Sequence, residues 1–233
     1  MENNATSLKK RARIAGLLYL ILIISGVYSI MIVPSRIIVL GDAAKTAQNI
    51  QFNEFLFRTG ILSDIISNTI FIFLVLTLYG LFKQVNGNKA KLMVALVIVQ
   101  IPAVFVMEAF NITSLMLFKG EILQTFDLSQ RQDLAMLLFK INDYGSLVLE
   151  MFWGLWLIPL GQLIKKSGFI PRIFGILIFI AGIAYIIDSF ISLLFPMYSA
   201  FVNQPTLLLV AIGEISIMLW FLIKGVKTQI NDK

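Results

Sequence analysis

Apolar residues fill this chain in six long stretches, separated by shorter segments that carry most of the charged side chains. Each stretch is about long enough to cross, as a helix, a hydrocarbon core roughly 30 Å thick. The pattern predicts an all-α, polytopic membrane bundle with one transmembrane domain at residues 14–223, between cytoplasmic tails at 1–13 and 224–233. It leaves residues 196–205 as an uncharged loop. The predicted spans cover residues 14–33, 55–82, 92–118, 129–165, 173–195 and 206–223.

Several local signals refine these boundaries. Asp42 follows Gly41 and precedes a run of helix-forming residues, so it is expected to cap a short surface helix. Ser129 and Gln132 have the spacing of a capping box, which predicts that the fourth span begins near Ser129. Pro102 is expected to kink the third span.

The distribution of charge predicts the orientation of the chain. The sequence has 19 Lys and Arg against 13 Asp and Glu, a net charge of +6. Most of the basic residues lie in the two tails and in the turns after the second and fourth spans. By the positive-inside rule both termini are then cytoplasmic. Topology therefore explains the basic character, and we expect the lipid bilayer rather than nucleic acid as the partner.

Two residue types are missing, and their absence excludes several kinds of chemistry. The chain has no cysteine and no histidine. It therefore cannot form disulfides, Cys/His metal sites or histidine-dependent triads. With 58% hydrophobic residues and a mean hydropathy of +0.89, it has little room for a soluble domain. We expect no cofactor and no metal ion, and we assign no catalytic residue.

Carboxylates inside the spans are the candidate functional groups. An ionisable side chain in hydrocarbon costs several kcal/mol, so it usually faces protein or a wet cavity. Counted from the cytoplasmic ends, Glu214 falls near the midplane and the others lie toward the outer interface, which predicts an outward-facing acidic cavity. Arg58 lies a third of a turn from Asp64, so its partner is expected on another helix. The candidate ligand-binding residues are Glu108, Glu150, Glu214, Asn111, Asn68, Asp64, Arg58, Asp143 and Asp188.

Three interpretations of these groups remain open. The first is a protein that binds or transports a small cation or amine through the acidic cavity, with Glu108, Glu150 and Glu214 as its deepest groups. The second is a structural or assembly protein in which the carboxylates only hold helices together through hydrogen bonds. The third is an intramembrane enzyme that uses a carboxylate pair as acid and base. The sequence indicates neither the ligand nor the oligomeric state.

Several segments together resemble a known family. They include residues 12–20, Gly41–Ala44, the turn Ser167-Gly-Phe-Ile-Pro-Arg172 and the run that ends at Asp188. In these segments the chain resembles the bacterial and archaeal membrane family called domain of unknown function 4386, over about residues 11–224. The resemblance implies the membrane topology and the plasma membrane of a prokaryote, but no activity. It points to Arg58, Asp64 and Asp188 as motif positions.

Overall fold

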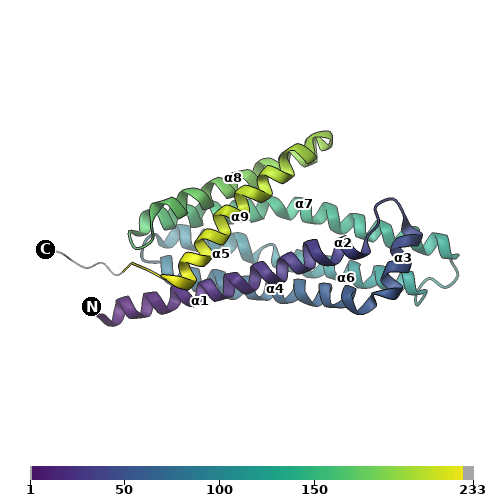
Figure 1. Cartoon of the computed structure of the whole chain (residues 1–233), viewed down its shortest axis with the longest axis horizontal. Coiled ribbons are helices and arrows are strands. Elements are labelled where there is room, and N and C mark those ends of the chain that lie inside the picture. The colour runs from purple at the N-terminus through teal and green to yellow at the C-terminus, as the bar shows by residue number, and fades with distance from the viewer. Residues whose placement is uncertain (1, 228–233) are drawn as a thin grey trace. The chain divides into compact units, whose positions relative to one another are not determined.

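The computed structural model describes residues 2–227, with side chains from residue 6 onward, and all regular structure in that range is helical (Figure 1). Six stretches in it are long and apolar enough to cross a membrane. These findings confirm the predicted all-α fold with six spans. The stretches are Thr6–Ile37, Glu54–Phe82, Gly87–Lys119, Leu128–Ser167, Arg172–Leu194 and Pro196–Ile223.

The first span is not a uniform α-helix. Helix α1 (Glu2–Val27) passes through a π-helical turn (Tyr28–Ile32) into α2 (Val33–Ile37). Pro34 explains the wider turn, because proline has no N–H and its ring pushes on the carbonyl four residues earlier.

A capped surface helix and an unbroken second span follow. Helix α3 (Ala43–Phe52) begins where Asp42 accepts a hydrogen bond from the Lys45 backbone N–H at 2.8 Å, which confirms the predicted cap. Helix α4 (Glu54–Phe82) then runs without interruption.

The third span is broken as predicted. Helix α5 (Gly87–Ile98) and helix α6 (Ile101–Lys119) are separated by Val99 and Gln100. Pro102 cannot donate to the carbonyl of Ile98, and its ring crowds that carbonyl. Gln100 therefore lies in the interruption and not on α6.

Helix α7 (Leu128–Ser167) begins with a capping box, but not the predicted one. Asp127 accepts from the Gln130 N–H at 2.8 Å, and the Gln130 side chain accepts from the Asp127 N–H at 3.1 Å. Ser129 instead donates its hydroxyl to Asp127 at 2.8 Å. The capping box lies two residues earlier than predicted, because Asp127 also offers a carboxylate that can cap, whereas the predicted start of the span near Ser129 is confirmed.

The prediction that residues 196–205 form a loop is also wrong. Helix α8 (Arg172–Leu194) is followed by a 3₁₀ turn (Pro196–Tyr198), and α9 (Ser199–Ile223) begins seven residues before Thr206. Pro205 lies inside α9. Membrane helices tolerate an internal proline because other groups satisfy the freed backbone, so Pro205 does not mark a helix start.

The chain forms two compact units, each built from separate segments. The first comprises Met1–Leu20, Ile70–Gln100 and Leu147–Lys233, and the second comprises Ile21–Thr69 and Ile101–Ser146. In the first unit α8 packs along α9 (Figure 1). In the second, a hydrophobic core joins α2, α3, α4, α6 and α7, and the Phe139 ring lies 5.7 Å from that of Phe57 and 5.8 Å from that of Phe118.

Two pairs of glycines set the packing of α7 against α8 in the first unit. A Cβ atom at Gly154 would lie 2.5 Å from the carbonyl oxygen of Gly182, and one at Gly175 would lie 2.6 Å from that of Gly161. Lipid supplies no hydrophobic drive for helix association, so close backbone packing through small residues contributes much of the attraction. The glycine pairs hold the two helices antiparallel in one register.

Candidate functional site

The candidate residues divide between the two units. Glu150, Asp188 and Glu214 belong to the first unit, and the others belong to the second. Two of the three deepest carboxylates, Glu150 and Glu214, are therefore in one unit, and Glu108 is in the other.

In the second unit Asp64 and Glu108 form a hydrogen-bonded carboxyl pair. Ser29, from the π-helical turn, donates to Asp64 at 3.2 Å, and Asn68 donates to it at 3.3 Å. Asn111, three residues later on α6, donates to Glu108 at 3.1 Å. Glu108 is only 7% exposed. Two carboxyl groups this close can share one proton, because both cannot ionise easily.

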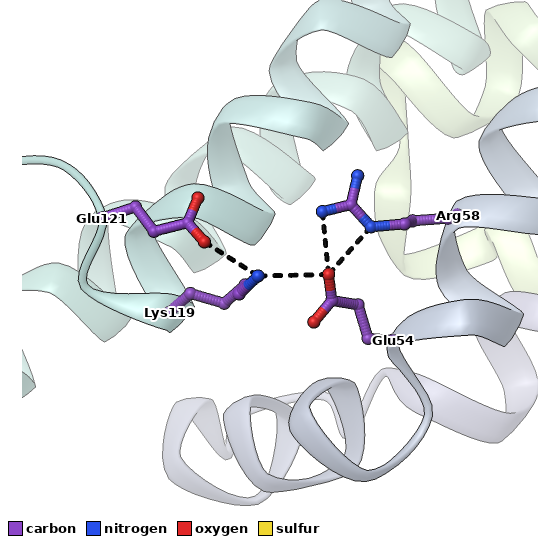
Figure 2. Close-up of polar contacts among 4 residues, drawn as sticks. All are labelled: Glu54, Arg58, Lys119 and Glu121. Atoms are coloured by element: carbon purple, nitrogen blue, oxygen red, sulfur yellow. Dashed lines mark hydrogen bonds and ion pairs between the residues drawn. The ribbon is translucent and has the colours of Figure 1, made fainter.

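Arg58 lies in a different environment from the one predicted. Its guanidinium pairs with Glu54, four residues earlier on α4, at 2.8 Å (Figure 2). Lys119, at the end of α6, also contacts Glu54 at 3.2 Å and pairs with Glu121 at 2.8 Å. The prediction that the partner of Arg58 lies on another helix is wrong, because helix α4 already begins at Glu54 and an i, i+4 pair satisfies the charge locally.

Asp143 stands apart from these groups. Its side chain is exposed on α7, and among the described residues it forms no hydrogen bond or ion pair.

The α7–α8 register brings Glu150 and Asp188 together in the first unit. Ser189, the residue after Asp188, donates to the Leu147 carbonyl at 2.9 Å, less than one turn from Glu150. The Glu150 and Asp188 carboxylates are close enough to interact electrostatically. Glu150 is half-buried and, within residues 6–227, receives no hydrogen bond.

Asp188 is satisfied by its neighbours and is only 2% exposed. Ser192 donates to it at 3.0 Å from the next turn of α8. Asn203 of α9 donates to the same oxygen at 2.7 Å. The hydropathy pattern missed Asn203, because it placed this residue in a loop.

Glu214 accepts a hydrogen bond from the first span. The hydroxyl of Tyr19, a fully buried residue on α1, donates to Glu214 at 2.8 Å. The Tyr19 ring also packs against Trp156 with the ring centroids 6.3 Å apart, and Phe71 contacts the same indole at 4.9 Å. Trp156 therefore packs against two aromatic rings.

Tyr185 joins these three carboxylates into one cluster. It interacts electrostatically with Glu214, Glu150 and Asp188. Its ring lies 6.0 Å from that of Trp153, nearly perpendicular to it. The sequence alone does not identify Tyr185 as a site residue, since a tyrosine within an apolar span is usually a packing residue. We define Glu150, Asp188, Glu214 and Tyr185 as the α7–α9 acidic cluster.

Positive charge is missing from the acidic cluster. The ion pairs among residues 6–227 all belong to the group around Glu54 shown in Figure 2, so no described Lys or Arg pairs with Glu150, Asp188 or Glu214. In the same part of the chain, no group of three or more acidic side chains has an arrangement that could hold a metal ion.

The spans and their embedded carboxylates define a polytopic helical membrane protein. The family model described as Domain of unknown function (DUF4386) matches residues 14–225, and the chain belongs to that family. An uncharacterized protein of Archaeoglobus fulgidus is 37% identical over 95 residues, which is 39% of this chain and 55% of that relative. The match thus spans about half the length of the archaeal protein. No solved structure matches the chain.

Proposed function

We propose that this protein lies in the plasma membrane of a prokaryote, with both termini cytoplasmic, and binds a small organic cation at the α7–α9 acidic cluster. A protonated amine is the ligand class that fits best. The deepest of the predicted site residues in this cluster are Glu150 and Glu214.

The observation that carries the proposal is the uncompensated negative charge around Tyr185. Three carboxylates lie near enough to the Tyr185 hydroxyl to interact with it electrostatically, and none of them pairs with a described Lys or Arg. Carboxylates gathered at membrane depth cannot all stay ionised without a cation beside them, and in its absence some of them must be protonated. Glu150 also has no hydrogen-bond donor among residues 6–227, so its oxygens are available to a ligand.

The arrangement favours an amine over a metal ion. A divalent metal needs several oxygens at about 2.0–2.6 Å, and the described acidic groups do not converge in that way. An ammonium group needs fewer contacts and is also attracted to aromatic faces, which Trp153 and Tyr185 supply beside the carboxylates.

A thermal-shift screen of the detergent-purified protein tests the proposal. Unfolding is followed by tryptophan fluorescence, with alkylamines, polyamines, Na⁺ and Mg²⁺ as ligands at several pH values. A ligand at about 100 times its Kd should stabilise the protein by about 2.7 kcal/mol. We expect a saturable shift with an amine that is lost in Glu150→Gln.

The matched control is Asp143→Asn, which removes an exposed carboxylate from the same helix. It should keep the amine response. The proposal fails if no amine shifts the melting curve, or if both variants reduce the response equally. Uptake of a responsive amine into proteoliposomes then tests whether the bound cation also crosses the membrane.

A structural function is the second candidate, and one observation favours it. Asp64, Glu108, Asp188 and Glu214 each accept a hydrogen bond from a neighbouring side chain. In that case Glu150→Gln should leave stability unchanged or raise it, and no cation should shift the wild-type curve at any pH.

A further inference from the structure

A groove lined by basic and apolar side chains lies along the exposed face of α1. It shares no residue with the α7–α9 acidic cluster. Its volume is about 360 Å³, and Thr6, Lys9, Lys10, Arg13, Ile14 and Leu17 line it. All six side chains are exposed. At about 100° per residue they fall on one side of the helix.

The opposite face of α1 is buried, which leaves the groove face free. Ala12, Ala15 and Tyr19 are fully buried there. A Cβ at Gly16 would lie 2.6 Å from the backbone nitrogen of Leu222, so α1 packs directly on the end of α9. At about 100° per residue Lys9 lies on the same side as Gly16 and borders this contact, whereas Ile14 lies on the far side of α1.

The charges in the groove have no ion-pair partner among the side chains of residues 6–227. None of the ion pairs among the described side chains involves Lys9, Lys10 or Arg13. The chain after α9 borders this positive region, because Gly225 approaches the Lys9 side chain.

The order of the groove residues matches the parts of a phospholipid. The basic side chains come first. Ile14 and Leu17, 43% and 52% exposed, follow directly after Arg13 and about one turn beyond it. The distance from Lys10 to Leu17 is about 10 Å along a helix, similar to the depth from a headgroup phosphate to the upper acyl chain. Side chains on a helix tilt toward its N-terminus, which moves the cations further toward the headgroup layer.

We propose that this groove is a binding site for one anionic phospholipid. Lys9, Lys10 and Arg13 contact the headgroup phosphate, and Ile14 and Leu17 contact the first part of an acyl chain. Topology alone requires basic residues on the cytoplasmic side. It does not require them to share a helix face with an adjoining exposed apolar surface.

Native mass spectrometry of the full-length protein tests this site, with phosphatidylglycerol and phosphatidylcholine added to detergent micelles. We expect the wild type to bind phosphatidylglycerol more tightly. The triple variant Lys9→Gln/Lys10→Gln/Arg13→Gln should lose roughly a hundredfold in affinity, at about fivefold for each charge. The control Lys165→Gln/Lys166→Gln/Arg172→Gln removes three exposed charges from another turn and should change affinity by less than about tenfold.

A second variant covers the case in which the triple variant does not fold. Leu17→Ser keeps every charge, and it should weaken phosphatidylglycerol binding by roughly fivefold. Three outcomes would overturn the proposal: no preference of the wild type for phosphatidylglycerol, an equal loss in both triple variants, or full competition by glycerophosphoglycerol, which would indicate a site for a free anion.

Discussion

Replacing Gly154 with alanine tests the packing that positions the acidic cluster. The added Cβ would lie 2.5 Å from the Gly182 carbonyl oxygen, whereas ordinary contacts begin at 3.4 Å. The backbone of α8 cannot rotate away as a side chain can. The two helices must therefore separate by about 0.9 Å, the difference between these distances, and a gap of that size forfeits up to half of each nearby dispersion contact.

The expected loss follows from two opposing terms. Overpacking at a rigid contact costs about 3 kcal/mol at the upper end of the usual range. Alanine has a higher helix propensity than glycine, which offsets up to about 1 kcal/mol of this cost. We therefore expect Gly154→Ala to lower the free energy of unfolding by about 2 kcal/mol.

The assay is reversible unfolding by SDS in mixed micelles, followed by tryptophan fluorescence. Trp153 and Trp156 flank the mutated position and report on it directly. The matched control is Gly87→Ala on α5, where no atom lies within 4 Å of the new Cβ. The control should be as stable as the wild type or slightly more stable.

One result would refute the reasoning. If Gly154→Ala unfolds at the wild-type SDS concentration, then α7 and α8 do not approach as closely as the glycine pairs require. A double variant sharpens the test. Because one separation of the helices relieves both clashes, Gly154→Ala with Gly161→Ala should cost less than the sum of the two single changes.

Three further changes test other parts of the structure. Tyr19→Phe removes the donor to Glu214 and should cost about 1–2 kcal/mol in the same SDS titration, whereas Glu214→Gln, which keeps an acceptor, should cost less. The Gln130 N–H at the cap of α7 holds the pKa of Asp127 below its usual value. The ionised Asp127 carboxylate therefore stabilises the folded state fully above its unfolded pKa of about 4, and this stabilisation is lost as the pH falls through the lower folded pKa. In an acid titration of stability, Asp127→Asn should lack this loss. Arg58→Ala should hardly change the unfolding midpoint, because its ion pair is exposed, and a large loss would indicate a partner beyond its own helix.

The spans could be predicted from the sequence because lipid allows few alternatives. Every backbone group in hydrocarbon must be paired within the chain, so an apolar stretch of sufficient length becomes a helix. Pro102 and Asp42 also act locally, through a missing N–H and a short carboxylate, and both predictions are confirmed.

The wrong predictions concern positions where two local sequence signals indicate different helix boundaries, or where contacts between residues distant in sequence determine the structure. Pro205 suggested a helix start, but α9 continues through it and brings Asn203 to Asp188. The partner of Arg58 was missed because the start of α4 at Glu54 was not recognised. The acidic cluster depends on the α7–α8 register, which is set by the pairs Gly154–Gly182 and Gly161–Gly175. A hydropathy pattern carries no information about which glycines meet.

The interruption at Val99 and Gln100 has a consequence for how the third span tolerates insertions and deletions. In a continuous helix such as α4, one inserted residue rotates all later side chains by about 100° and exchanges lipid-facing with protein-facing positions. Between α5 and α6 the backbone already leaves the helical path, so an extra residue can be absorbed there without changing the phase of either helix. Among members of the family, length variation within the spans should therefore concentrate at this position.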